Sequence, residues 1–270
     1  MTSRLFSLLC ALLSVFVVVT TSRAAAAESV TLHSAFLGNQ STHGCTQHTA
    51  SFDILTTSFG NQKSVYVHLK ERDGAWIDIP ATYIETIPDG REVWRAGTSY
   101  GQGACPTAKQ APDTFEFAVK VSTPSGDTWD SNGGSNYAGA KGSGSFLVGA
   151  DVTLAWANVT KSPSGANTFS AEGFLRNLGY SKDVAVVYSV DGWITTNTAA
   201  LAYKPSYQSG YGYYASPNAN GVEVWGLGPS WEPLFTFAGS CVDFVIRYRV
   251  NGAEFWDNNF GRNHRRCVAP

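Results

Sequence analysis

An internal repeat constrains the fold more than any other feature of this 270-residue chain. The stretch "GNQKSVYVHL" at residues 60–69 matches "GYSKDVAVVY" at residues 179–188, which puts Lys63 opposite Lys182. Further along, "WDSNGGSNY" at residues 129–137 matches "WDNNFGRNH" at residues 256–264. Landmarks that recur in one order over about a hundred residues indicate two copies of one structural unit.

Each copy has the residue pattern of β-strands. "FEFAVKV" at residues 115–121 and "FVIRYRV" at residues 244–250 alternate, so that every second residue faces the same side. Turn pairs such as Asp-Gly and Asn-Gly separate the apolar runs, and no stretch after residue 27 has sustained helical periodicity. The sequence therefore predicts an all-β protein made of two tandem antiparallel β-sandwiches.

The N-terminal residues have the form of a secretory signal peptide. Arg4 precedes an apolar run from Leu5 to Val19, and small residues follow as far as Ala27. The run is shorter than the roughly 20 residues that span a membrane. We expect residues 1–27 to be removed and the mature chain to be secreted and free of the membrane. The remaining residues divide into a first sandwich (28–137), a flexible Gly/Ser-rich linker (138–149) and a second sandwich (150–270).

Four cysteines remain after the signal peptide. An even number in an exported chain indicates two disulfides, and of the three possible pairings we prefer the local one, Cys45–Cys105 with Cys241–Cys267. A metal site built on "HGCTQH" at residues 43–48 lacks a fourth ligand, so no metal is expected. The sequons at Asn39 and Asn158 are candidate N-glycosylation sites.

The charge balance argues against two classes of partner. The formal charge is −2, and removal of the signal peptide takes away Arg4 and Arg23 but no acidic residue. Such a chain has no electrostatic reason to bind nucleic acid or anionic lipid. We also expect no cofactor.

The repeated Trp-Asp segments suit a sugar ligand. Sugar hydroxyls form hydrogen bonds with amides and carboxylates, and the C–H face of a pyranose ring packs on a flat aromatic ring. Each segment offers both kinds of group, and Gly134 and Gly261 permit sharp bends of the backbone. Asp130 and Asp257 have two open interpretations, as sugar ligands or as side chains that fix the loop.

The second copy resembles a known family through four stretches: "RNLGYSKDVAVVYSVDGW" (176–193), "VEVWGL" (222–227), "DFVIRYRVNGAEFWDNN" (243–259) and "GRNH" (261–264). They are similar to the family 21 carbohydrate-binding modules, the starch- and glycogen-binding type. The first copy resembles the family more faintly. The resemblance implies an immunoglobulin-like sandwich without catalytic activity that binds α-1,4-glucan.

The resemblance also implies particular site residues. The carbohydrate-binding candidates are Trp193, Trp256, Asp257, Asn258 and Asn263, with Tyr180, Lys182 and Tyr203 at a second site, and Trp76, Trp129, Asp130 and Asn136 in the first copy. The match departs from the family at Val245, where some members carry a third aromatic ring, and at His264, which replaces a Tyr. Lys63 and Lys182 are alternatively solvated surface residues, and Trp94 and Trp225 are expected in the core.

Other functions have less support. A glycosidase needs two carboxylates that face each other across a cleft, and no motif here pairs them. No Gly-x-Ser-x-Gly segment is present either. The alternatives are an adhesive wall or surface protein that binds another glycan or a protein, or the binding part of a system with a separate glycoside hydrolase. Glycogen-targeting phosphatase subunits share the module in the cytosol, which the export signal disfavours.

Overall fold

The protein is all-β over the residues that the computed structural model describes, which are 27–105, 109–161, 165–209, 212–226 and 233–268. Within these ranges the strands are antiparallel, and the one helical segment is a short 3-10 turn at Asn132–Gly134. No described helix is long and apolar enough to cross a membrane. The signal peptide expected at residues 1–27 lies, apart from Ala27, outside the described residues.

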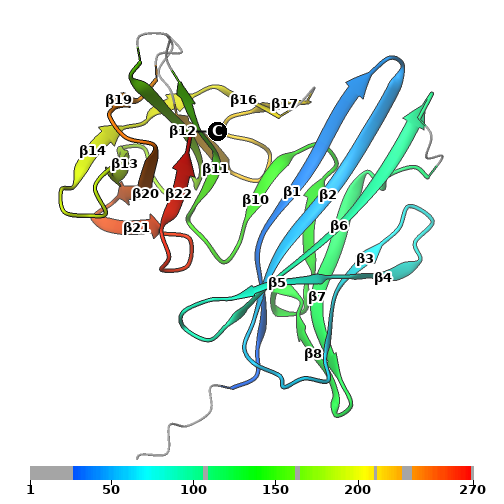
Figure 1. Ribbon diagram of the computed structural model, residues 1–270. Coiled ribbons are helices and arrows are strands. Elements are labelled where there is room, and N and C mark those ends of the chain that lie inside the picture. Colours follow the sequence, from blue (N-terminus) through cyan, green and yellow to red (C-terminus); the bar gives the residue numbers. More distant parts are fainter. Residues whose placement is uncertain (1–26, 106–108, 162–164, 210–211, 227–232, 269–270) are drawn as a thin grey trace, which may run out of the picture.

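The first half of the chain forms two sheets (Figure 1). One sheet has the order β10-β1-β2-β6-β5, and the other has the order β4-β3-β7-β8 with β9 also paired to β7. The strands are β1 (Val30–Thr42), β2 (Cys45–Thr56), β3 (Ser64–Lys70), β4 (Trp76–Pro80), β5 (Thr82–Thr86), β6 (Glu92–Gly103), β7 (Thr114–Thr123), β8 (Gly126–Asp130), β9 (Tyr137–Ala140) and β10 (Gly144–Leu147).

The second half repeats the order of four strands in each sheet, but it has no counterpart of β10 and has β19 as an extra strand paired to β12. Its sheets run β11-β12-β18-β15, with β19 also paired to β12, and β14-β13-β20-β21, with β22 also paired to β20. A separate two-stranded ribbon, β16-β17, has no counterpart in the first half. The strands are β11 (Val152–Lys161), β12 (Asn167–Arg176), β13 (Lys182–Ser189), β14 (Asn197–Ala200), β15 (Ala202–Lys204), β16 (Ser206–Ser209), β17 (Gly212–Ala215), β18 (Val222–Gly226), β19 (Phe235–Phe237), β20 (Cys241–Val250), β21 (Ala253–Asp257) and β22 (His264–Cys267).

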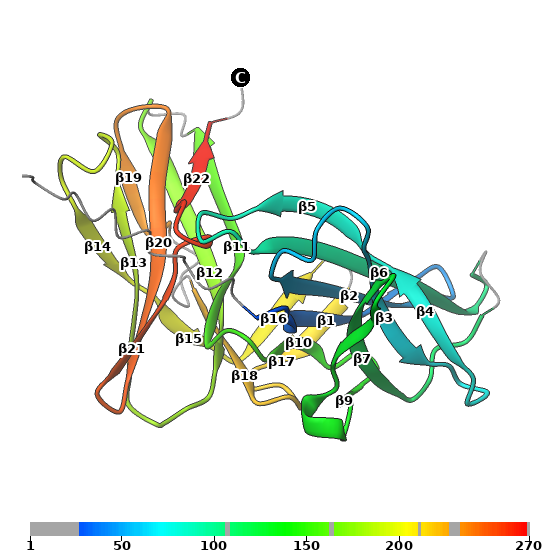
Figure 2. The same ribbon diagram turned by 90° about the horizontal axis from the view of Figure 1, so that it is seen from below.

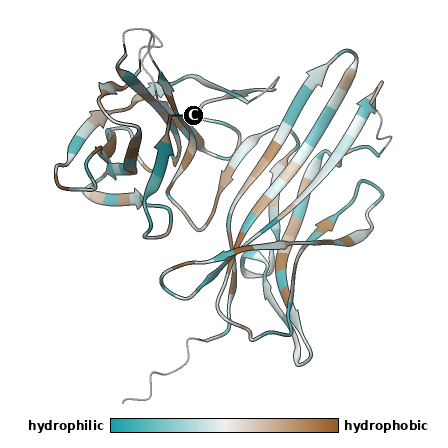
Figure 3. Ribbon diagram, viewed as in Figure 1, coloured by the Kyte–Doolittle hydropathy of each residue, from teal (hydrophilic) through white to brown (hydrophobic). Residues whose placement is uncertain are grey.

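Each half encloses its own apolar core between its two sheets. The alternation predicted from the sequence is confirmed, because Phe115, Phe117 and Val119 on β7 are fully buried. Phe244 and Ile246 on β20 are likewise buried in a second, separate cluster. Brown apolar segments accordingly alternate with teal or white ones along the strands in Figure 3. The predicted disulfides are also confirmed, one in each half: Cys45–Cys105 and Cys241–Cys267.

The prediction of a flexible linker at residues 138–149 is wrong. Strand β9 pairs with β7, and β10 extends the other sheet by pairing with β1. The glycines here serve close packing, because a Cβ at Gly139 would lie 2.5 Å from Cδ1 of Leu37. Gly144 has φ +83°, which glycine adopts without strain. The Gly/Ser composition thus reflects tight contacts and a turn, and the segment belongs to the first sandwich.

The two halves pack against each other where β1 and β10 of the first meet β12, β17 and β18 of the second. Figures 1 and 2 show the β16-β17 ribbon extending from the second half toward β1. Phe36 of β1 points away from its own core, and its ring lies 6.2 Å from Phe174 and 5.2 Å from Tyr214, centroid to centroid. The Tyr214 hydroxyl accepts a hydrogen bond from the Asn39 backbone N–H (2.8 Å). Tyr207 and Tyr214 belong to "SYQSGYGYY" (206–214), which from the sequence is either an extension of the sugar surface or a tyrosine-rich loop. These two tyrosines contribute to the contact between the halves.

Candidate functional site

The two Trp-Asp loops have the same backbone geometry. In the first half Asn132, Gly133, Gly134 and Asn136 have positive φ, as do Asn259, Phe260, Gly261 and Asn263 in the second. The side-chain amide of Asn132 donates to the carbonyl of Asn136, and that of Asn259 donates to the carbonyl of Asn263 (3.1 Å each). The sequence repeat is thus a structural repeat at these loops, with the conformation held by their asparagines and glycines.

Asp130 and Asp257 hold their loops in place, which favours the loop-fixing interpretation over sugar contact. Asp257 accepts hydrogen bonds from the backbone N–H groups of Leu154 (2.5 Å) and Asn259 (3.1 Å). Asp130 accepts from the backbone N–H of Leu32 (2.8 Å) in the same way. Both carboxylates therefore join the terminal loop of a sandwich to its first strand. Their acceptor capacity is directed into the protein, which favours the loop-fixing role over sugar contact.

The pKa of Asp257 is lowered even though burial by itself would raise it. The pKa is lowered first by His264, whose Nε2 lies 3.0 Å from Oδ1 of Asp257, and then by the backbone N–H groups of Asn259 and Leu154. In the first half Tyr137 takes the place of His264 and donates its hydroxyl to Asp130 (2.8 Å).

The tryptophans that precede these aspartates are exposed. Trp129 and Trp256 each expose 44 % of their surface, on strands β8 and β21 at equivalent edges of the two sandwiches. Trp256 pairs across the sheet with Arg247, and its indole N–H donates to Glu254 (2.8 Å). The predicted amide ligand Asn258 is exposed beside it, and Asn263 is half-buried. Trp256 and Asn258 are therefore both exposed at this edge, and the Asn258 Oδ1 accepts a hydrogen bond from the backbone N–H of Gly261 (2.9 Å).

The first half has an aromatic cluster on the same face. The imidazole of His68 stacks on Trp76, with centroids 4.8 Å apart and an angle of 8°, and meets Trp129 edge-on at 5.3 Å. The ammonium group of Lys120 lies 5.0 Å from the Trp129 ring. Asn136 donates to Glu116 (3.1 Å). Sequence reasoning missed His68, although its place in the alternating strand "VYVHL" puts it on the outer face beside Trp76.

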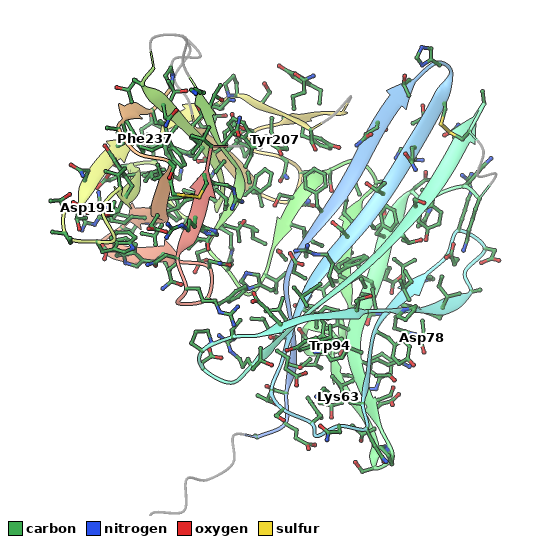
Figure 4. All side chains as sticks on the ribbon, viewed as in Figure 1. Lys63, Asp78, Trp94, Asp191, Tyr207 and Phe237 are labelled. Atoms are coloured by element: carbon green, nitrogen blue, oxygen red, sulfur yellow. A yellow bond between two sulfur atoms is a disulfide. The ribbon has the colours of Figure 1, made fainter. Side chains whose placement is uncertain are left out.

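Trp193 lies in the loop between β13 and β14, toward the edge of the sheet opposite to that of Trp256. Its φ is +69°, and its backbone N–H donates to the Ser189 hydroxyl (2.8 Å). Asp191, labelled at the outer end of the second half in Figure 4, accepts from the N–H of Thr195 (3.0 Å). The backbone N–H and the hydroxyl of Thr195 lower the pKa of Asp191 to about 2. The loop is thus ordered by its own hydrogen bonds and holds the half-buried Trp193.

The predicted second site divides into exposed and buried members. Tyr180 is fully exposed and Tyr203 is 44 % exposed. Lys182, by contrast, has only 4 % of its side chain exposed, and its Nζ donates to Glu223 (3.1 Å) and Asn177 (2.9 Å). The pair joins β13 of one sheet to β18 of the other. The expectation of a solvated lysine is therefore wrong, and this side chain is directed to neighbours within the protein.

The first half contains the same arrangement. Lys63 donates to Glu92 (2.8 Å), which also accepts from the indole N–H of Trp94 (3.0 Å), and Figure 4 shows Lys63 and Trp94 close together. Trp225 likewise donates to Glu223 (2.9 Å). Both tryptophans are half-buried and pack against the apolar cores, in keeping with the expected core role.

The sequons differ in exposure. Asn158 is exposed on β11, and its side-chain amide donates to Thr160 of its own sequon (3.2 Å). Asn39 lies on β1 at the contact between the halves, with its Oδ1 buried. Sequence reasoning also missed Trp156 on β11, which is 42 % exposed. Among the described residues, no group of three His, Cys, Asp or Glu side chains could hold a metal ion.

Comparisons with known proteins find relatives of the second half. Residues 153–266 match the family model of the carbohydrate/starch-binding module (family 21). Glycogen-binding subunit 76A of Drosophila melanogaster is 31 % identical over 105 residues, which are 36 % of this chain and 12 % of that protein. Human protein phosphatase 1 regulatory subunit 3E is 33 % identical over 88 residues (33 % and 27 %), and glucoamylase 1 of Rhizopus oryzae is 31 % identical over 104 residues (37 % and 14 %).

These relatives are longer proteins, of which the match spans between about an eighth and about a quarter. Two solved structures are also similar. The starch-binding domain of Rhizopus oryzae glucoamylase, in complex with β-cyclodextrin and maltoheptaose, is 26 % identical with a TM-score of 0.28, over 45 % of this chain and 94 % of that one. The carbohydrate-binding module of the muscle glycogen-targeting subunit of protein phosphatase 1 is 21 % identical with a TM-score of 0.29 (43 % and 73 %). Residues 153–266 thus match the carbohydrate/starch-binding module of family 21, the family that the sequence motifs resemble.

Proposed function

We propose that this protein is a secreted, non-catalytic carbohydrate-binding protein for α-1,4-glucan of the starch or glycogen type, built from two tandem immunoglobulin-like sandwiches. The observation that carries the proposal is the family 21 match at residues 153–266, within which Trp256 and Asn258 are both exposed and line the same cleft. A pyranose ring stacked on Trp256 would place its hydroxyls within reach of such an amide.

Trp193 contributes to the same face in this proposal. The loop of Trp193 and the edge strand of Trp256 lie at opposite sides of one sheet, with the cross-strand pair Val187 and Val245 between them. Both valines are nearly buried, although neither is in the core cluster of the second half. A shallow surface above these two buried valines, with a ring at each side, suits several successive sugars of one chain. The small Val245, where some family members have an aromatic ring, makes this surface flat.

The common order of four strands in each sheet supports a tandem arrangement, in which the first half is a divergent copy. Its cluster of Trp76, His68 and Trp129 occupies the face that corresponds to the proposed sugar site. We assign the first half a glycan-binding role through this cluster, and we expect a separate glycoside hydrolase to act on the bound polymer. The sequence features of a signal peptide and the two disulfides support secretion.

Retention of the purified mature chain on insoluble starch, cellulose, chitin and β-1,3-glucan tests the proposal. We expect retention on starch, its loss in Trp256→Ala, and unchanged retention in Trp156→Ala. Trp156 is a matched control, because it is the same residue type with nearly the same exposure, 42 % against 44 %. Retention on another polymer alone, or equal behaviour of the two variants, would contradict the α-glucan site. Because the ligand is neutral, added salt should change retention little.

A further inference from the structure

We propose that the cleft between the two halves extends the glycan site of the second half, and that Asp89 and Arg91 of the first half contact a long glucan chain bound there. This inference rests on the proposed function. A cleft of about 460 Å³ lies where the halves meet. Trp256 and Asn258 line it from the second half, and Asp89 and Arg91 line it from the first. The exposed ring of the proposed sugar site thus opens into a space whose opposite wall belongs to the other sandwich.

The wall of the cleft is held in place by the Trp-Asp loop of the second half. Phe260 packs against an apolar cluster of the first half that consists of Leu55, Ile87 and Val93. Its ring centroid also lies 5.0 Å from the imidazole of His33. Two positions further on, Arg262 donates to the carboxylate of Glu85 and to the carbonyl of Thr86.

The sequence difference between the two loops shows that this docking is encoded in the chain. The loops share their φ signs and their internal hydrogen bonds, yet Phe260 and Arg262 stand where the first half has Gly133 and Ser135. Phe260 has φ +56°, a conformation that is unfavourable for a bulky residue and is taken by Gly133 (φ +66°) in the first half. A ring at this position is explained by its contact with the first half, so the cleft is a feature of this chain's own fold.

The chemistry of the first-half wall suits a neutral polyhydroxyl chain. Asp89 and Arg91 form an ion pair (2.8 Å) in the turn between β5 and β6, with 51 % and 43 % of their side chains exposed. The hydrogen bonds from Arg91 lower the pKa of Asp89, which remains an ionised acceptor. The pair therefore offers fixed acceptors and donors side by side, as adjacent sugar hydroxyls require, without the excess of positive charge that an anionic ligand would need.

Two groups that line the cleft have no partner for their own kind of contact within the described part of the chain: an exposed ring and an unpaired nitrogen. The ring of Trp256 keeps 44 % of its surface exposed at the margin. Nδ1 of His33, which also lines the cleft, is buried and has no hydrogen-bond partner among the described residues. A chain that stacks on Trp256 and continues past Asn258 would meet the Asp89–Arg91 pair. A short oligosaccharide would occupy the Trp256 end alone, so chain length separates this site from the one already proposed.

The test is titration of the full mature chain with maltoheptaose and with maltotriose, for Arg91→Ala, Asp89→Asn and the control Arg72→Ala. Arg72 is an exposed loop arginine of the first half that lines no part of the cleft. We expect Arg91→Ala and Asp89→Asn to weaken maltoheptaose binding by about five- to tenfold, the size of one or two lost hydrogen bonds, and to leave maltotriose binding unchanged. Arg72→Ala should leave both unchanged.

The outcomes separate the two proposals. If Arg91→Ala binds maltoheptaose as well as Arg72→Ala does, or loses both sugars equally, the composite site is wrong. If Trp256→Ala keeps binding both sugars, the proposed site itself is wrong. Phe260→Gly removes the docking ring while keeping the loop conformation that glycine accepts, and it should lower the affinity for maltoheptaose more than that for maltotriose. Equal melting curves for Arg91→Ala and the parent exclude misfolding as the cause.

Discussion

Replacing Lys182 by Met separates a structural role of this lysine from a sugar-binding one. The side chains of Lys182 and Glu223 are 4 % and 8 % exposed and join the two sheets of the second sandwich. Met fills a similar volume but leaves the carboxylate of Glu223 without its cation. Breaking a buried pair in this way costs about 3–5 kcal/mol. For a domain of roughly a hundred residues, each kcal/mol lowers the melting temperature by about 4–8 °C, so a fall of more than 10 °C is expected.

The assay combines calorimetric melting with binding to soluble glycogen below the melting temperature. Lys182→Met should melt early and still bind glycogen when folded, because its ammonium is directed to Glu223 and Asn177. The double variant Lys182→Met, Glu223→Met should lose much less stability than the sum of the single variants, since it leaves no unpaired charge. Lys63→Met, whose pair with Glu92 is somewhat more exposed (10 % and 14 %), should show a smaller fall.

A sugar-binding role for Lys182 would give the opposite result. In that case Lys182→Met would melt like the parent and lose affinity for glycogen. That outcome would refute the reasoning from burial and would return this lysine to the second sugar site, beside the exposed Tyr180.

Three further predictions follow from the described contacts. Trp193→Ala should stay folded and lose about 1–3 kcal/mol of glucan binding free energy, by analogy with base stacking on aromatic side chains. Trp225→Ala should lose up to about 3 kcal/mol of folding stability. If the two variants behave the other way round, the surface and core assignments of these tryptophans must be exchanged. On secretion from a eukaryotic host, Asn158 should carry a glycan and Asn39 should not, which peptide mapping with and without glycosidase will show. The folded-state pKa of Asp257 is lowered, so its contribution to stability is present above the unfolded-state pKa of about 4 and is lost as the pH falls through the folded-state pKa. In urea unfolding, the stability advantage of the parent over Asp257→Asn should therefore shrink below about pH 4. A difference that stays constant with pH would contradict this.

The fold could be predicted from the sequence because its signals are local and repeated. The alternation around Phe117 and Phe244 sets which face of each strand is buried, and the local pairing of the cysteines agrees with strands that lie side by side. The segment at residues 138–149 was misread because glycine and serine are typical both of flexible linkers and of strands in close contact. Only the neighbours of Gly139, such as Leu37, distinguish the two cases, and they are more than a hundred residues away or on another strand.

The candidate site was predicted less completely. The tryptophans were found because a Trp beside amides and glycine is a chemical signal in itself, and Trp256 is indeed exposed. The burial of Lys182 could not be read from the sequence, because its partner Glu223 lies on a strand of the opposite sheet. The docking role of Phe260 and Arg262 was hidden as well, since two changed residues in a loop look like ordinary variation until the surface they contact is known.

The docked loop also determines how copies of this protein can associate. The contact is head-to-tail, because the loop of the second half meets a different surface on the first. A head-to-tail contact that repeats from chain to chain builds an open filament. Two sequence differences between the halves disfavour a repeat of this contact between chains. The first-half loop carries Gly133 and Ser135 and has no ring or guanidinium to insert. In the second half Phe174 stands where the first half has Leu55, and it already packs on Phe36. The docking contact described here is therefore made between the two halves of one molecule.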